Sequence, residues 1–140
     1  MPPAPEPVGS YVPVVRVNDL VFTSGQLPMR EGKLTGAGKV GSALTIEQGA
    51  EAAQVAVLNA LAQVAAAVGG LSHIERMVRL RVFVNSADGF TAQADVANGA
   101  SDLLVAVFGD AGRHARAAVG VNELPLDAAV ELELIAKIKG

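Results

Sequence analysis

Arg116 is the residue whose setting points most clearly to chemistry. It lies within a short stretch, residues 115–121, whose other members are all Ala, Val or Gly. A charged group in such a stretch is costly unless it is paired or binds an anion. The small residues Ala118 and Gly120 would leave room beside it for a ligand. Since a guanidinium can hold a carboxylate through two parallel hydrogen bonds, we expect an anion site that suits a carboxylate.

A purely structural role for Arg116 stays open beside this hypothesis. Glu131 and Glu133 alternate with apolar residues in the segment 130–138. If that segment forms the strand next to Arg116, the two carboxylates share a face with the arginine. An internal Arg–Glu salt bridge would then account for the charge.

Other catalytic groups lack the surroundings that their chemistry needs. His73 and His114 are the only histidines and fall on different segments, so we expect no metal site. Ser24 lacks the flanking glycines of a nucleophile elbow and has no evident histidine partner. The chain has no cysteine, which excludes a thiolate zinc site, a disulfide framework and a cysteine nucleophile.

The glycine-rich string GAGKVG, residues 36–41, matches the dinucleotide-binding fingerprint by its letters alone. That motif needs a buried strand directly before it and a helix that opens at its end. Polar residues precede the string, and three residues lie between it and the helix start expected at Thr45. It is no P-loop either, because Val40 follows Lys39 where that loop needs Ser or Thr. We therefore expect a flexible loop.

Composition narrows the class of protein and the kinds of partner. The 140 residues suit one domain, residues 1–140, and residues 1–8 form a proline-rich, flexible lead-in without the pattern of a secretory signal. The net charge is -3 and the basic residues are scattered, so we expect no nucleic-acid partner. Residues 52–74 lack charge but are mostly Ala, which favours a buried helix and no membrane span. These features predict a cytoplasmic protein.

Hydrophobic periodicity predicts an α+β fold with two helices packed on one face of a sheet. A threonine and a glutamine three residues apart form a capping box at the first helix start, and Gly69-Gly70 ends that helix. The second helix should begin near residues 88–90 and contain a weak point at Gly99. The predicted strands are 11–17, 20–24, 77–84, 115–121 and 130–138, and the predicted helices follow Thr45 and residues 88–90.

The sheet face without helices should be mixed in character, which suggests self-association through it. The residues expected on this face are both apolar and charged. They are Met77, Phe83, Ala118, Gly120 and Ile135 with Arg79, Arg81, Arg116, Glu131 and Glu133.

Three separated motifs now show a resemblance to a known family. They are Gly9-Ser-Tyr11, Phe22-Thr-Ser-Gly-Gln-Leu-Pro28 and the run from Arg116 to Ala136. In this order they resemble the Rid family, also called the YjgF or L-PSP endoribonuclease-like family, over residues 8–139. The resemblance implies a chorismate-mutase-like fold with a mixed sheet, and a homotrimer with ligand clefts between subunits.

The resemblance also implies a reaction. Members of the best-studied branch hydrolyse enamines and imines to 2-keto acids and ammonia, without metal or organic cofactor. By position, Arg116 corresponds to the arginine that holds the substrate carboxylate and Glu131 to the acid that orients water. The remaining implied site residues are Tyr11, which lines the cleft, Ser24 and Gly25 in the pocket wall, and Ala118, which acts through its backbone.

Departures from the family pattern leave the substrate open. Ala118 stands in place of a cysteine, residues 9–13 read GSYVP, and the segment 90–108 is longer than usual. We expect an imine deaminase of a divergent subgroup. A second hypothesis is a non-catalytic trimeric module that binds small carboxylates such as 2-keto acids. A third is an endoribonuclease or translation inhibitor. The acidic pI and the low number of aromatic residues argue against this third hypothesis.

Overall fold

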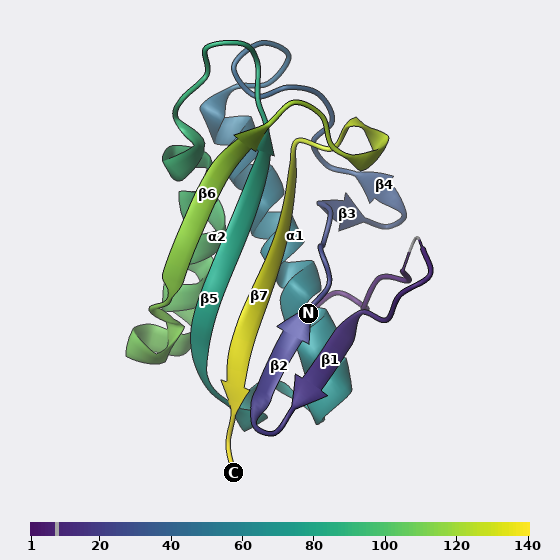
Figure 1. The fold of residues 1–140 in the computed structure, drawn as a ribbon, viewed down its shortest axis with the longest axis vertical. Coiled ribbons are helices and arrows are strands. Elements are labelled where there is room, and N and C mark those ends of the chain that lie inside the picture. The colour runs from purple at the N-terminus through teal and green to yellow at the C-terminus, as the bar shows by residue number, and fades with distance from the viewer. Residues whose placement is uncertain (8) are drawn as a thin grey trace.

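The computed structural model describes residues 1–7 and 9–140; Val8, the last residue of the predicted lead-in, lies outside them. The elements follow the predicted order, with a small additional sheet in the glycine-rich segment (Figure 1). The strands are β1 (Val14–Val17), β2 (Leu20–Thr23), β3 (Met29–Arg30), β4 (Lys33–Leu34), β5 (Ile74–Asn85), β6 (Ala115–Val121) and β7 (Val130–Ile138). The helices are α1 (Ile46–Val68) and α2 (Gln93–Phe108), with short 3₁₀ turns at Leu71–His73, Gly109–Gly112 and Pro125–Asp127.

One five-stranded mixed sheet organises the molecule. Its strand order is β1-β2-β7-β5-β6, with β5 and β6 parallel and the other neighbours antiparallel. Both helices pack on one face of this sheet, as Figure 1 shows, and the buried core lies between the two layers. The α+β prediction with two helices on one face is therefore confirmed.

The first helix begins and ends where the sequence predicted. The Thr45 side chain accepts from the Gln48 backbone N–H, and the Gln48 side chain accepts from the Thr45 N–H, so the capping box is complete. Gly69 ends α1 in a left-handed conformation that suits glycine. By length and composition α1 could cross a membrane, but its apolar side is buried against the sheet and α2. It is the core helix of the domain.

The second helix starts later than predicted and contains no weak point at Gly99. Residues 87–90 form a turn that includes a glycine with positive φ, so α2 begins at Gln93 and not near residues 88–90. At Gly99 an added Cβ would lie 2.0 Å from the Ala50 carbonyl oxygen of α1. Glycine is present because the two helix backbones meet there.

Two predictions about the faces of the sheet are wrong. A β-bulge between Met77 and Arg79 shifts the alternation of β5, so Met77 is fully buried with Leu80. The strand β6 pairs with β5, and its register sets Arg116 opposite Leu80 on the helix-covered face. Ala118 and Gly120 follow on the same face, opposite other buried residues of β5. These four residues therefore do not belong to the open face.

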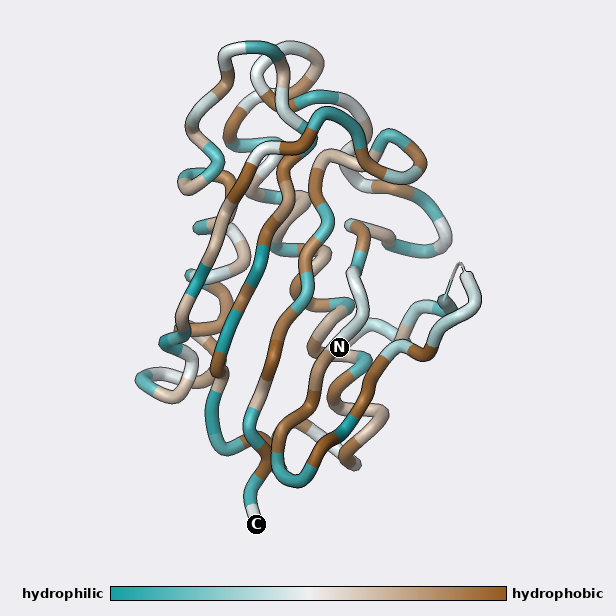
Figure 2. The backbone as a smooth tube through the Cα atoms, viewed as in Figure 1, coloured by the Kyte–Doolittle hydropathy of each residue, from teal (hydrophilic) through white to brown (hydrophobic). Residues whose placement is uncertain are grey.

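The open face nevertheless keeps the mixed character that was predicted. The hydropathy colours alternate along β5 and β7 in Figure 2, as expected for strands with one buried face. Val15, Val17, Phe22 and Val119 are exposed apolar residues, and the first three lie towards one edge of the sheet. The register adds Arg79, Arg81, Phe83, Glu131, Glu133 and Ile135 to this face.

Candidate functional site

The residues that the sequence singled out form two separate groups in the structure. Glu131 lies on the open face of the central strand β7, and Gly25 lies directly against its carboxylate. Arg116 lies on the helix-covered face of the edge strand β6. The alternative of an internal salt bridge between Arg116 and Glu131 or Glu133 is wrong, because β5 separates their strands and the side chains leave opposite faces.

Neutral side chains of α2 hold Arg116. Its Nη1 donates to Asn98 Oδ1 at 2.7 Å and to Ser101 Oγ at 3.2 Å. Among residues 1–7 and 9–140, no carboxylate forms an ion pair with it. Since both hydrogen bonds use Nη1, Nε and Nη2 remain for a ligand. The half-buried guanidinium is positioned but its charge is not neutralised.

His114 continues the hydrogen-bond chain from Arg116 and Ser101 and fixes the Ser101 side chain. His114 Nδ1 lies 2.6 Å from the Gly112 carbonyl oxygen, and its Nε2 lies 2.9 Å from Ser101 Oγ. A neutral His114 with its proton on Nδ1 satisfies this pattern: it donates to Gly112, and Ser101 donates to Nε2 while accepting from Arg116. The histidine therefore has a positioning role in this chain of hydrogen bonds.

Asn98 and Ser101 were not predicted as site residues from the sequence. They are three residues apart, which places them on neighbouring positions of one helix face. Because these two polar residues lie in a largely apolar segment, their spacing could have predicted that this helix face makes a hydrogen-bonded contact. Their partner could not be named, because it depends on α2 lying over β6.

The space predicted beside Arg116 is only partly present. An added Cβ at Gly120 would lie 2.7 Å from Gln93 Nε2 and 2.9 Å from Ser86 Oγ. These two side chains thus occupy the position that the glycine leaves open. Ala118 is half-buried and packs against the core beneath α2.

Tyr11, Ser24, Gly25 and Glu131 form the second group. The Ser24 hydroxyl donates to the Val12 carbonyl at 2.6 Å, which ties the loop that carries Tyr11 to the end of β2. Tyr11 and Gly25 both line one pocket. Gly25 has no room for a side chain, because a Cβ there would lie 2.3 Å from Glu131 Oε1. Ser24 therefore anchors the loop that carries Tyr11 but is not part of the pocket lining, and Gly25 leaves room for the Glu131 carboxylate.

The electrostatics of Glu131 differ from those of an ordinary surface carboxylate. Partial burial raises the pKa of Glu131, and the negative charge of Glu133 raises it further. Glu133 itself pairs with Arg81 at 3.4 Å. A carboxylate whose pKa is raised towards neutrality is better suited to accept and return a proton.

The other sequence candidates have structural roles. Lys39 of the glycine-rich string donates to Asn85 Oδ1 at 3.0 Å and to the Asn122 carbonyl, while Val40 is fully buried. Within the part of the chain that the structure describes, no three His, Cys, Asp or Glu side chains are grouped as metal ligands.

Comparison with known proteins places this geometry in context. Residues 1–138 match the family model described as "YjgF/chorismate mutase-like, putative endoribonuclease". The chain is 44% identical over 139 residues to Protein TCP17 of Trypanosoma cruzi, covering 99% of this chain and 87% of that protein. It is 31% identical over 141 residues to a 2-iminobutanoate/2-iminopropanoate deaminase of Dermatophagoides farinae, covering 99% and 93%.

A solved structure from the same comparison contains a small ligand. It is the crystal structure of E. coli TdcF with bound serine, with a TM-score of 0.71 and 25% identity over 96% of this chain and 92% of that one. The fold of this chain thus agrees with that of a solved structure that holds serine.

Proposed function

Because this chain belongs to the YjgF/chorismate mutase-like family, we propose that it hydrolyses 2-imino acids and their enamine tautomers to 2-keto acids and ammonia. Water adds to the imine carbon, the carbon–nitrogen bond then breaks, and the oxygen of water stays in the keto acid while the nitrogen leaves as ammonia. A relative named as a deaminase and a family structure with bound serine support this class of substrate.

The single observation that carries the proposal is the state of Arg116. Its hydrogen bonds to Asn98 and Ser101 are made to neutral groups, and its ion-pair capacity is unused within residues 1–7 and 9–140. A partly desolvated guanidinium that is held in place but not neutralised is well prepared to bind a carboxylate. We assign it the carboxylate of the imino acid.

Glu131 is the proposed proton-transfer residue. In its ionised form it would orient a water molecule and accept a proton as that water attacks the imine carbon. The same carboxyl group would return the proton to the departing nitrogen. The raised pKa of Glu131 suits both steps, and an imine is already electrophilic, so positioning and proton transfer suffice. In this scheme Tyr11, Ser24 and Gly25 form the wall beside Glu131, and the Ala118 backbone lies beside Arg116.

A complete site under this proposal requires two copies of the chain. Arg116 and Glu131 leave opposite faces of one sheet, so they cannot meet one substrate within a protomer. Arg116 lies on the edge strand β6, where a second copy can approach, and the open face carries exposed Val15, Val17 and Phe22. We propose a homotrimer in which Arg116 of one protomer completes the Glu131 site of its neighbour.

The test measures the rate at which imino acids, generated in situ by an amino-acid oxidase, are lost. We expect the wild type to accelerate their loss, Arg116→Ala to raise KM strongly, and Glu131→Gln to lower kcat. Arg113→Ala is the matched control, because Arg113 is an exposed arginine three residues away that pairs only with Asp110. Arg116→Lys should recover little, since lysine lacks the planar fork.

Each outcome decides between the two hypotheses. If the wild type never exceeds the Arg116→Ala background, the deaminase proposal is wrong. Saturable binding of 2-keto acids that is lost in Arg116→Ala would then identify a carboxylate-binding module. A pure monomer in sedimentation at micromolar concentration would contradict the shared site.

A further inference from the structure

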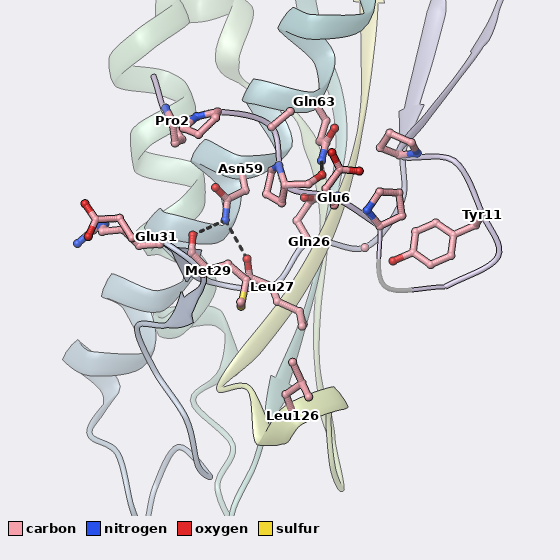
Figure 3. A pocket seen from close by; sticks show the side chains of 18 residues that line it. Pro2, Glu6, Tyr11, Gln26, Leu27, Met29, Glu31, Asn59, Gln63 and Leu126 are labelled. Carbon is pink, nitrogen blue, oxygen red and sulfur yellow. Dashed lines mark hydrogen bonds between the residues drawn. The ribbon is translucent and has the colours of Figure 1, made fainter.

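A pocket of about 500 Å³ adjoins the Glu131 half of the proposed site. It lies between the proline-rich N-terminal segment, the residues that follow β2, and one side of α1 (Figure 3). Its volume falls within the usual range for small-ligand pockets, roughly 300–1,000 Å³. Gly25 belongs to its lining and also lies against the Glu131 carboxylate, so the pocket and the proposed reacting centre share this residue as a neighbour.

Two amide side chains of α1 help to build the pocket wall. Asn59 Nδ2 donates to the Leu27 carbonyl at 3.1 Å and to the Met29 carbonyl at 2.8 Å. Gln63 Nε2 donates to the Pro5 carbonyl at 2.6 Å, which attaches the N-terminal segment to α1. Both amide side chains are buried. The rest of the lining is mainly apolar, with proline rings and the side chains of Tyr11, Leu27, Met29 and Leu126, and it also includes the charged residues Glu6, Arg30 and Glu31.

Leu126 is held at the pocket in an unusual way. Its side chain is highly exposed, and its φ of 59° is in the left-handed region that leucine rarely adopts. Asp127, with a φ of 58°, follows it and accepts a 3.0 Å hydrogen bond from Asn85 Nδ2. The fully buried Asn85 also donates to the Ala128 carbonyl at 3.0 Å. Backbone strain kept by such anchoring is typical of a residue placed for contact with a ligand.

We infer that this pocket receives the apolar side chain of the substrate, so that the preferred 2-imino acids carry aliphatic chains of about four carbons and not a methyl group. The inference rests on the proposed function, because it assumes that the carboxylate lies at Arg116 and the imine carbon at Glu131. Both a methyl group and a leucine-type side chain are smaller than the pocket, but the leucine-type side chain removes more apolar surface of both partners from water.

The test compares imino acids generated in situ from leucine and from alanine. For the wild type we expect kcat/KM to be at least about tenfold higher with the leucine-derived substrate, because each added methylene in an apolar pocket changes discrimination by that order. Leu126→Trp should fill the pocket and abolish the preference, and Leu126→Ala should reduce it. The matched control Val107→Trp changes an exposed aliphatic residue of α2 that is outside the pocket lining, and it should keep the wild-type ratio.

A binding measurement separates this inference from the catalytic proposal. Calorimetry with 4-methyl-2-oxopentanoate and with pyruvate reports the side-chain preference without turnover. If no imine is hydrolysed but the larger keto acid binds more tightly, and Leu126→Trp removes that difference, the catalytic proposal fails and the pocket assignment stands. Three results would overturn the pocket assignment. They are equal kcat/KM or equal affinity for the two side chains, a preference that Leu126→Trp leaves unchanged, or a protein that binds neither keto acid and hydrolyses neither substrate.

Discussion

The contact between Gly25 and Glu131 gives a sharp test of how the carboxylate is positioned. In Gly25→Ala the new Cβ would lie 2.3 Å from Glu131 Oε1, 2.9 Å from Cδ and 3.1 Å from Cγ. Ordinary non-bonded contacts need about 3.5 Å, so the carboxylate must move by about 1 Å. A misplacement of that size in a catalytic group costs about 10²-fold in rate. This corresponds to about 2.7 kcal/mol in activation free energy.

The assay is the initial rate of loss of an imino acid formed in situ, measured for Gly25→Ala, Glu131→Gln and the double variant. If alanine acts by displacing Glu131, the double variant should be no slower than Glu131→Gln alone, because the displaced carboxylate is already gone. Circular dichroism and thermal unfolding check that Gly25→Ala keeps its fold. A Gly25→Ala rate within threefold of the wild type, or fully additive losses in the double variant, would refute this explanation of Gly25.

Two further predictions concern stability. Because burial, and secondly Glu133, raise the pKa of Glu131 above its ordinary value of 4.5, the folded state holds this proton more tightly than the unfolded state. The stability that Glu131 contributes is therefore fully present below that value and is lost as the pH rises through the folded-state pKa. In denaturant unfolding at fixed protein concentration, the free energy of unfolding of Glu131→Gln should increase relative to that of the wild type between pH 4 and pH 7. A difference in unfolding free energy that stays constant over this range would contradict the raised pKa of Glu131. In Gly99→Ala the Cβ would meet the Ala50 carbonyl oxygen at 2.0 Å, so we expect a loss of about 1–3 kcal/mol in the free energy of unfolding. A Gly99→Ala variant as stable as the wild type in denaturant unfolding would exclude the close helix contact as the reason for glycine at this position.

Local signals in the sequence predicted much of this fold because they act over a few residues. The capping box at Thr45 and Gln48 satisfies backbone groups within one helical turn, so the start of α1 could be read directly. The turn at Asn18, whose φ is 54°, joins the two strands of the predicted hairpin. The resemblance to the Rid family added the mixed sheet, and family membership and fold agree with it.

Features that depend on distant partners could not be predicted in this way. The bulge after Met77 adds one residue to β5, and strict alternation therefore assigned Met77 to the wrong face. The face of Arg116 follows from β6 pairing with β5, whereas the salt bridge would have needed β7 as its neighbour. The contact of Asn98 with Arg116 exists only once α2 has packed over β6. In each case the missing information is long-range: a register shift in β5, the order of the strands, or the packing of a helix on the sheet.

The close approach of α1 and α2 has a consequence for anyone who redesigns this protein. Ala50 and Gly99 touch through their backbones, and Gly99 directly follows Asn98, which holds Arg116. Further along α1, Asn59 holds the wall of the apolar pocket. One helix thus sets the positions of Arg116 and of the apolar pocket. If the proposed function and pocket assignment hold, a core mutation that shifts α1 would alter carboxylate affinity and side-chain preference together, without touching the ligand.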